Sequence, residues 1–296
     1  MNLAGIAARL LLARRFPHRR VVRRGISWSL DLREAIDLSI YLTGSFQPRV
    51  VRSVRRALSG ADTCFIDVGA NRGAVTIPVA HFRPTCRVVC VEPVNEMIRR
   101  LRQGLSMNPT INRVEIVHAF LSATGTDQRQ VPRLVDASWN LFADANERMQ
   151  SGAVALATDG AVSITLDDLV GSLGLSRVDV VKIDVDGFEL DVLRGAHRTL
   201  RRFSPLLVME WSPSSQCLRH ADPAELVDLL KEAGYRPQRI HRSGRSTDVG
   251  WKYLNRVRDG ASRDMVFVSS HEADLAGRDE GHSQQQETVS EPRNVG

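Results

Sequence analysis

Three carboxylates follow a short apolar run in the second half of the chain, in the stretch KIDVDGFE (182–189). They are Asp184, Asp186 and Glu189, and the residues before them, VDVV, have the composition of a buried strand. Ionised carboxylates beside a buried strand are costly unless other groups pair with them. The stretch is therefore a candidate for a calcium loop, a catalytic centre or the start of a capped helix.

A calcium loop of the EF-hand type is excluded by the residues around Gly187. In the twelve-residue loop the glycine is sixth, the first residue is an acid and the twelfth is a bidentate glutamate. Aligning Gly187 with that glycine puts Lys182 first and Leu193 twelfth. The preceding segment also has the pattern of a strand, whereas the EF-hand loop follows a helix.

Asp186 and Glu189 have the spacing of a helix capping box, with Asp186 at the N-cap and Glu189 three residues later. Apolar residues then recur at the helical period, which predicts a helix from Gly187 to about Phe203. We expect Asp186 to be structural. The sequence leaves Glu189 open between completing the cap and a polar contact in an active site.

A glycine turn with acids on both sides forms a second candidate site, in FIDVGANRG (65–73). Gly69 and Gly73 permit a tight turn and close approach of the backbone to a ligand. Asp67 would repel a pyrophosphate but suits a ligand with an ammonium or sulfonium group. Glu92 ends the next strand, where a carboxylate can accept both hydroxyls of a ribose. This combination points to S-adenosylmethionine, and a nicotinamide or nucleotide site and a purely structural turn are the alternatives.

The chain resembles the FkbM family of S-adenosylmethionine-dependent methyltransferases from about Trp28 to Ser270. Four motifs carry the resemblance in this order: FIDVGANRG, VVCVEP, ITLDDL and VDVVKIDVDGFELDVLRGA. It implies an α/β, Rossmann-like fold with the seven-stranded sheet of class I methyltransferases, helices on both faces and the last strand antiparallel. It also implies O-methylation of a hydroxyl on a sugar, glycan or polyketide-like natural product. The cofactor residues implied by position are Asp67, Gly69, Ala70, Asn71 and Gly73 near the methionine end, Glu92 at the ribose, and Ala119 and Phe120 beside the adenine.

Asp184 ends its predicted strand, at the edge where parallel sheets bind ligands. It could orient or deprotonate the acceptor hydroxyl by general base catalysis, or it could pair with Lys182 or a backbone amide. Glu210, after the next strand, could join Asp184 in holding a Mg²⁺ ion that lowers the pKa of the acceptor hydroxyl. The candidate catalytic residues are Asp184, Glu210 and Glu189, and no residue is assigned as a metal ligand.

The elements that must position these residues alternate between apolar runs and helical patterns, which predicts a parallel sheet covered on both faces. Residues 123–165 break this alternation, and SWNLFADA and AVSITL are expected there as hairpin strands. The expected main strands are 63–69, 87–93, 114–122, 178–184 and 205–211, followed by a helix at 223–235 and closing strands at 236–242 and 264–270.

The charge of the chain is concentrated at its start. The net charge is +6, and residues 1–25 hold seven arginines and no acid, so the remaining chain is nearly neutral. This argues against a nucleic-acid partner. The family resemblance implies a small-molecule or glycan acceptor. The expected organisation is a basic tail at 1–25, a helical lead-in at 26–60, a methyltransferase domain at 61–270 and a disordered polar tail at 271–296.

The basic tail has an apolar stretch too short to span a bilayer. It is either a surface helix or solvated tail, a peripheral contact with an anionic membrane, or a transit peptide. Four cysteines without a C-x-x-C pair indicate a reduced, cytoplasmic protein. Through its basic tail, such a protein could also lie at the inner membrane. The alternative function is a non-catalytic module of the same fold that binds a nucleotide or a partner at the membrane surface. The sequence predicts neither the acceptor nor the oligomeric state.

Overall fold

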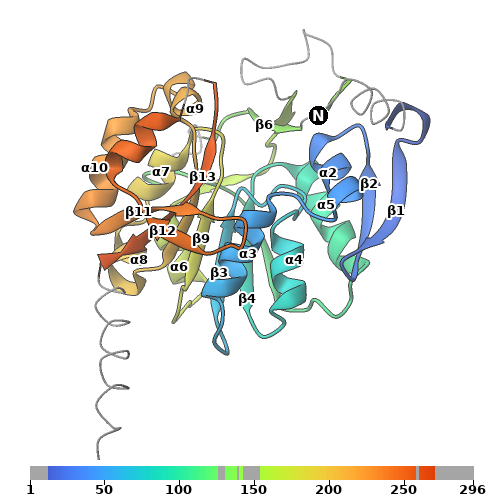
Figure 1. Cartoon of the computed structure of the whole chain (residues 1–296), viewed down its shortest axis with the longest axis horizontal. Helices are drawn as coiled ribbons and strands as arrows, with labels where there is room; N and C mark the ends of the chain where they lie inside the picture. The colour runs from blue at the N-terminus through green and yellow to red at the C-terminus, as the bar shows by residue number, and fades with distance from the viewer. Residues whose placement is uncertain (1–12, 126–130, 139, 143–153, 258–259, 271–296) are drawn as a thin grey trace, which may run out of the picture.

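The computed structural model describes residues 13–125, 131–138, 140–142, 154–257 and 260–270 (Figure 1). The predictions for the first twelve residues and for the polar tail at 271–296 lie outside this part of the chain. Within it, no helix is long and apolar enough to cross a membrane.

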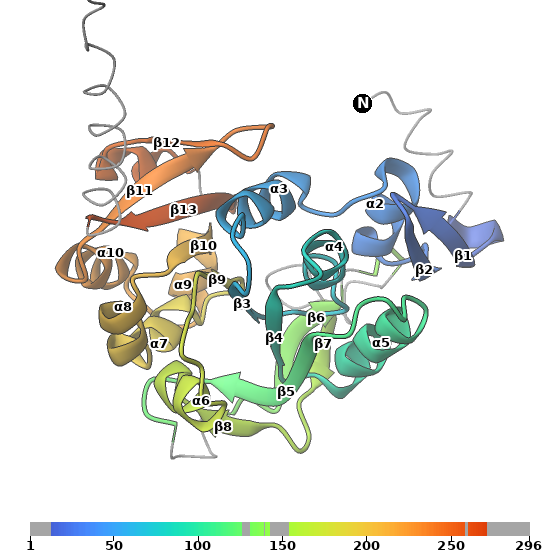
Figure 2. The same ribbon diagram turned by 90° about the horizontal axis from the view of Figure 1, so that it is seen from below.

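A mixed nine-stranded sheet lies at the centre of the molecule, in the order β12-β11-β13-β10-β9-β3-β4-β5-β8 (Figures 1 and 2). Five neighbouring strands of this sheet are parallel: β5, β4, β3, β9 and β10. β13 lies antiparallel between β10 and β11. Seven of the strands make the predicted methyltransferase sheet, and β8 and β12 extend its two edges, so the predicted fold class is confirmed. The bounds are β3 (Cys64–Val68), β4 (Arg87–Glu92), β5 (Val114–Leu121), β8 (Val162–Ile164), β9 (Val180–Ile183), β10 (Leu206–Trp211), β11 (Tyr235–Ile240), β12 (Ser246–Asp248) and β13 (Arg263–Ser269).

Helices cover both faces of the sheet because its central strands are apolar on both sides. In β3, Ile66 packs into one hydrophobic cluster and Phe65 into the other, as the strand period of two requires. The cluster around Ile66 is covered by α6 (Leu166–Ser172), α7 (Glu189–Arg194), α8 (His197–Phe203) and α10 (Pro223–Glu232). The cluster around Phe65 is covered by α2 (Ala35–Thr43), α3 (Pro48–Ala57), α4 (Thr76–Phe82) and α5 (Asn95–Ser106) (Figure 2). The remaining described helices are α9 (Pro213–Leu218) and the 3-10 helix η2 (Trp251–Arg256).

The lead-in begins with a hairpin, so the prediction that it is helical from residue 26 was wrong for its first part. β1 (His18–Arg23) and β2 (Ile26–Asp31) pair antiparallel around Arg24 and Gly25, which both have positive φ. Buried and half-buried residues alternate in β2, the period of a strand with one face inward. The end of the basic tail is therefore ordered as β1, and the helical part of the lead-in is α2 and α3.

The lead-in is attached to the glycine turn through Arg72, which is almost fully buried. Its guanidinium forms an ion pair with Asp37 of α2 and donates to the carbonyl of Ser29 in β2 at 3.0 Å. Burial lowers the pKa of Arg72 to about 9. Loss of one partner from a buried ion pair strongly destabilises a fold. This contact therefore fixes the lead-in against the sheet.

The irregular segment differs from the predicted hairpin. β6 (Leu134–Ser138) pairs antiparallel with β7 (Val154–Ala157) in a separate two-stranded ribbon. β8 lies within AVSITL as expected for a strand, but it pairs in parallel with β5 at the sheet edge. SWNLFADA, the other strand of the expected hairpin, lies partly outside the described residues.

Candidate active site

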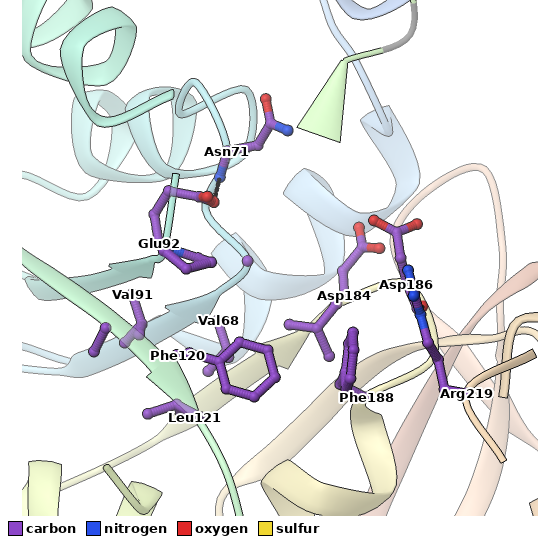
Figure 3. A pocket seen from close by; sticks show the side chains of 14 residues that line it. Val68, Asn71, Val91, Glu92, Phe120, Leu121, Asp184, Asp186, Phe188 and Arg219 are labelled. Carbon is purple, nitrogen blue, oxygen red and sulfur yellow. Dashed lines mark hydrogen bonds between the residues drawn. The ribbon is translucent and has the colours of Figure 1, made fainter. Parts of the chain in front are cut away.

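The carboxyl ends of β3, β4, β5 and β9 surround a pocket (Figure 3). This is the edge at which a parallel sheet with this strand order binds ligands. Six residues predicted from the sequence line the pocket: Gly69, Asn71, Glu92, Ala119, Phe120 and Asp184.

Gly69 follows β3 and lies directly against the end of β9. A Cβ atom at this position would lie 2.0 Å from the carbonyl oxygen of Asp184, and φ is +73°, which favours glycine. The N–H groups of Gly69 and Ala70 both donate to the carbonyl of Val91, at 3.0 and 3.1 Å. The turn is therefore held between the ends of β4 and β9.

Glu92 ends β4 and is held by two backbone amides. Oε2 accepts from the N–H of Asn71 at 2.7 Å, drawn as a dashed line in Figure 3, and Oε1 accepts from the N–H of Val94 at 2.9 Å. Burial raises the pKa of Glu92 to about 7, although both amides act against this rise. Each carboxylate oxygen keeps a further lone pair, so the two oxygens can accept the two hydroxyls of a ribose.

Three of the predicted cofactor residues lie behind the pocket wall, where they support it. Ala70 is buried in the turn. Gly73 packs against α5, since a Cβ there would lie 2.4 Å from Cδ1 of Leu101. Asp67 is fully buried and accepts from the hydroxyl of Thr76 at 2.6 Å. Asp67 therefore has its partners within the protein, and its side chain does not line the pocket as the sequence predicted.

Lys182 in β9 is the cationic partner of Asp67. Its ammonium nitrogen lies 3.0 Å from Oδ1 of Asp67 and 3.6 Å from Oδ2 of Asp184, and it donates to the carbonyl of Gly69 at 3.0 Å. Burial alone would lower the pKa of Lys182, but the charges of Asp67 and Asp184 outweigh it and raise the pKa above its ordinary value. The expected pairing of Lys182 with a neighbouring acid is confirmed, and Asp67 is the shorter contact.

Asp184 lines the pocket, and one of its carboxylate oxygens is fixed by neighbouring side chains. Oδ2 accepts from Nε2 of Gln47 at 3.1 Å and lies near Lys182, and the side chain is 22% exposed. Within the described part of the chain, no hydrogen bond is made to Oδ1. Gln47 precedes α3 in the lead-in, and no signal in the sequence joins it to a residue 137 positions away.

The loop after Asp184 differs from the predicted capping box. The N-cap of α7 is Phe188, so the prediction of Asp186 at the N-cap was wrong. Asp186 instead has a φ of +51° and lines the pocket. Glu189 is 1% exposed and accepts from the N–H groups of Val185 and Gly187 at 3.3 and 3.2 Å, and burial raises its pKa to about 7. Glu189 therefore supports the loop from the core, away from the pocket lining.

The predicted helix after this loop is interrupted, because α7 ends before Gly195 and α8 begins at His197. A Cβ at Gly195 would lie 2.4 Å from the carbonyl oxygen of Ser122. The close approach of the loop after β5 accounts for the glycine at this break.

Glu210 lies outside this pocket, near the end of β10. Oε1 accepts from the hydroxyl of Ser262 at 2.5 Å, and Asp264 is its register partner in β13. Burial, followed by the charge of Asp184, raises the pKa of Glu210 to about 8. Among the described residues, no group of three or more His, Cys, Asp or Glu side chains could hold a metal ion, so a Mg²⁺ site at Asp184 and Glu210 finds no support.

Two functional residues were missed by sequence reasoning. The ring of Phe188 lies 5.0 Å from that of Phe120 in an edge-to-face arrangement, and the guanidinium of Arg219 lies 4.8 Å above Phe188 (Figure 3). Phe188 is within KIDVDGFE but was assigned to the inner face of a helix. Arg219 follows α9, and no motif marks it.

Taken together, these residues fit S-adenosylmethionine. Glu92 can accept hydrogen bonds from the two hydroxyls of a ribose. The aromatic pair formed by Phe120 and Phe188 offers an apolar wall for adenine. The sheet order and the position of the pocket define a class I methyltransferase fold.

The comparison with protein families agrees with this class. The model of the methyltransferase FkbM domain matches residues 67–237. The chain therefore belongs to the FkbM methyltransferase family, as the motifs predicted, and the protein is a methyltransferase enzyme.

Individual relatives are distant. The 2-O-methyltransferase NoeI of Sinorhizobium fredii is 26% identical over 62% of this chain and 76% of its own. AMB antimetabolite synthetase AmbE of Pseudomonas aeruginosa is also 26% identical, over 59% of this chain, which spans only 10% of AmbE. The solved structure of methyltransferase FkbM from Methylobacillus flagellatus is 15% identical, with a TM-score of 0.42 over 70% of this chain and 43% of its own.

Proposed function

We propose that the protein is an S-adenosylmethionine-dependent O-methyltransferase acting on a hydroxyl of a sugar, glycan or polyketide-like natural product. The observation that carries this proposal is the asymmetry of Asp184. Asp184 lines the pocket, its Oδ2 is held by Gln47 and Lys182, and its Oδ1 has no hydrogen-bond partner in the described chain. A carboxylate fixed in this way is suited to accept a proton.

The cofactor would be held at the end of β4. Glu92 accepts the ribose hydroxyls, while Phe120 and Phe188 exclude water from the adenine. When bound, S-adenosylmethionine supplies a methyl group made electrophilic by its sulfonium. The glycine turn keeps the backbone close enough to the ligand because Gly69 has no side chain.

Asp184 would act on the acceptor. A hydroxyl must lose its proton as its oxygen forms the new bond to carbon, and Oδ1 is the atom that would take that proton. Gln47 and Lys182 hold the carboxylate in one orientation, which reduces the entropy lost in reaching the reactive geometry. NoeI, whose name gives 2-O-methylation, supports oxygen as the accepting atom.

Calorimetry with S-adenosylhomocysteine tests the cofactor site. We expect the wild-type protein to bind it and Glu92→Ala to bind at least about tenfold more weakly, a loss of about 1.4 kcal/mol. Folded wild-type protein that fails to bind, or equal binding by Glu92→Ala, would contradict the proposal.

A panel of hydroxyl compounds, followed by release of S-adenosylhomocysteine and mass spectrometry of the product, tests the reaction. The panel includes methyl glycosides with and without a free 2-hydroxyl, oligosaccharides and polyketide alcohols. We expect methylation on oxygen, and a reduction of about 10²- to 10⁴-fold in Asp184→Asn, the range of general base catalysis. Full activity of Asp184→Asn would remove the assigned base.

We also propose a cytoplasmic enzyme whose basic residues 1–25 contact anionic membranes. The seven arginines of this segment support the contact, since each is worth about 1 kcal/mol near an anionic surface. Cosedimentation with vesicles containing phosphatidylglycerol, compared with pure phosphatidylcholine, tests it. Equal binding to both vesicles would argue against a membrane role.

A further inference from the structure

A second pocket, separate from the one that holds the cofactor residues, has three arginines among its seven lining residues. Three of its lining residues are Arg49, Arg239 and Arg263, and the others used below are Tyr253, Ser262 and Asp264. They come from the start of α3, the end of β11, η2 and the start of β13 with the residue before it. We refer to these six residues as the arginine pocket.

The three arginines of the arginine pocket are exposed. Arg49, Arg239 and Arg263 form no ion pair with any described residue, whereas some other arginines are paired with acids, as Arg33 is with Asp31. Arg263 donates to the hydroxyl of Tyr253 and lies 5.1 Å from its ring centre. Guanidinium groups gathered in one pocket repel one another, and an anion with two or more oxygens would reduce this repulsion by bidentate hydrogen bonds.

One acid lies in the arginine pocket, and it does not neutralise it. Asp264 is half-buried at the start of β13, and burial and then the charge of Asp184 raise its pKa to about 6. The positive charge of Arg49, which lines the same pocket, acts in the opposite direction on the pKa of Asp264. With three arginines and one acid, the lining is positive at neutral pH.

The arginine pocket lies near Asp184 across neighbouring strands. Asp264 is the register partner of Glu210 in β10, and Met209, just before Glu210, pairs with Ile183, the residue before Asp184. Gln47, which bonds to Asp184, is two residues before Arg49 at the start of α3. On the other side, Ser262 donates to Glu210, whose pKa is raised in part by the charge of Asp184. A molecule in the arginine pocket could therefore extend toward the strand end that carries Asp184.

The segment that supplies most of this pocket is also rich in basic residues. It is a second concentration of positive charge, in addition to the one in residues 1–25. Residues 235–264 contain seven arginines and one lysine, against three aspartates. The folded body is nearly neutral as a whole, but its charge is uneven, and the positive part lies beside the proposed acceptor side of the active site.

We propose that the arginine pocket binds an anionic group, a phosphate or a carboxylate, carried by the methyl acceptor. The inference rests on the proposed O-methyltransferase function and narrows its substrate class to anionic hydroxyl compounds. The arginines bind the anionic end, and the hydroxyl to be methylated then lies toward Oδ1 of Asp184.

Calorimetry on the protein saturated with S-adenosylhomocysteine tests this proposal with three probes: glucose 6-phosphate, glucuronate and glucose. We expect at least one charged sugar to bind about tenfold or more tightly than glucose, and to bind less tightly as salt is added. Preference for glucose 6-phosphate identifies a phosphate, and preference for glucuronate identifies a carboxylate. Equal binding of all three, or no binding of either charged sugar, overturns the proposal.

Two double variants separate the pocket from the general charge of the protein. Arg49→Gln with Arg239→Gln should abolish the preference for the charged sugar and leave the affinity for S-adenosylhomocysteine within about twofold. Arg102→Gln with Arg201→Gln removes the same charge from exposed positions outside the pocket and should keep the preference. An equal loss in both variants overturns the assignment to this pocket. Failure of the wild-type protein to bind S-adenosylhomocysteine would instead refute the proposed function.

Discussion

The ammonium nitrogen of Lys182 lies 3.0 Å from Oδ1 of Asp67, and both side chains are almost completely buried. The two residues are register partners in β9 and β3, the adjacent parallel strands whose ends carry Asp184 and the glycine turn. Because Lys182 also bonds to the carbonyl of Gly69, one buried cation fixes the two halves of the site relative to each other.

Replacing Lys182 with methionine should strongly destabilise the fold. The variant leaves the Asp67 carboxylate buried without a counter-charge, and breaking a buried pair in this way costs about 3–5 kcal/mol. Urea denaturation measures the loss. Lys231→Met is the matched control, since Lys231 pairs with Asp228 on the surface, where a pair contributes about 1 kcal/mol or less. Similar losses in the two variants would show that the buried pair has no special role.

The position of Asp67 shows where sequence reasoning was sufficient and where it was not. The motif FIDVG correctly located the turn at the end of a strand, because an apolar run followed by glycine has few other structures. The direction of the Asp67 side chain depends on the strand period, which places it on the same face as Phe65, toward α4 and Thr76. An acid next to a glycine turn was therefore assigned to the ligand when it belongs to the core.

Residues that line the pocket were predictable when they lie at the carboxyl end of a strand, as Glu92, Phe120 and Asp184 do. Those contributed by distant elements were not. Gln47 reaches Asp184 from the lead-in, which is attached to the sheet by the buried pair of Arg72 and Asp37 and by apolar packing around Phe65. Such long-range docking has no local pattern in the chain.

Gln47 should matter for the reaction more than for stability. It has a φ of +42°, and its buried Oε1 has no hydrogen-bond partner among the described residues, so the fold bears a cost to place Nε2 against Asp184. Gln47→Met keeps the side-chain volume and removes the bond. We expect kcat to fall about 10- to 100-fold, as for a misplaced catalytic group, with the KM for S-adenosylmethionine unchanged.

The control for Gln47 is Gln238→Met, which removes a similar amide–carboxylate bond to Asp248 at the sheet edge. Steady-state kinetics with the acceptor found in the hydroxyl panel, together with thermal unfolding, compare the two variants. A purely structural role for Gln47 would appear as a lower unfolding temperature with kcat preserved.

Glu92 should make both stability and ligand binding depend on pH. Its pKa is raised from 4.5 to about 7 in the folded protein, so the stability that its protonation contributes is present below about pH 4.5 and is lost as pH rises through 7. A ribose donates its hydroxyls to the ionised carboxylate. Affinity for S-adenosylhomocysteine should therefore increase between about pH 6 and about pH 8.

Glu92→Gln isolates this effect from Glu189 and Glu210, whose pKa values are also raised by burial. Calorimetry across the same pH range should show weaker binding by the variant and a flatter dependence on pH. An equally steep dependence in the variant would assign the pH effect to another group.

Substituting Gly69 should separate backbone strain from the close approach of the two strand ends. Gly69→Ala adds a Cβ that would lie 2.0 Å from the carbonyl oxygen of Asp184. The glycine turn and the loop that begins at Asp184 must therefore move apart. Gly234→Ala is the control, because Gly234 has a similar φ of +78° and nothing within 4 Å of an added Cβ. Both variants bear the strain of a left-handed backbone, about 1–2 kcal/mol, but only Gly69→Ala should also lose binding of S-adenosylhomocysteine by about tenfold or more. Calorimetry and urea denaturation give the two quantities, and retention of wild-type affinity by Gly69→Ala would mean that the turn can open without disturbing the cofactor site.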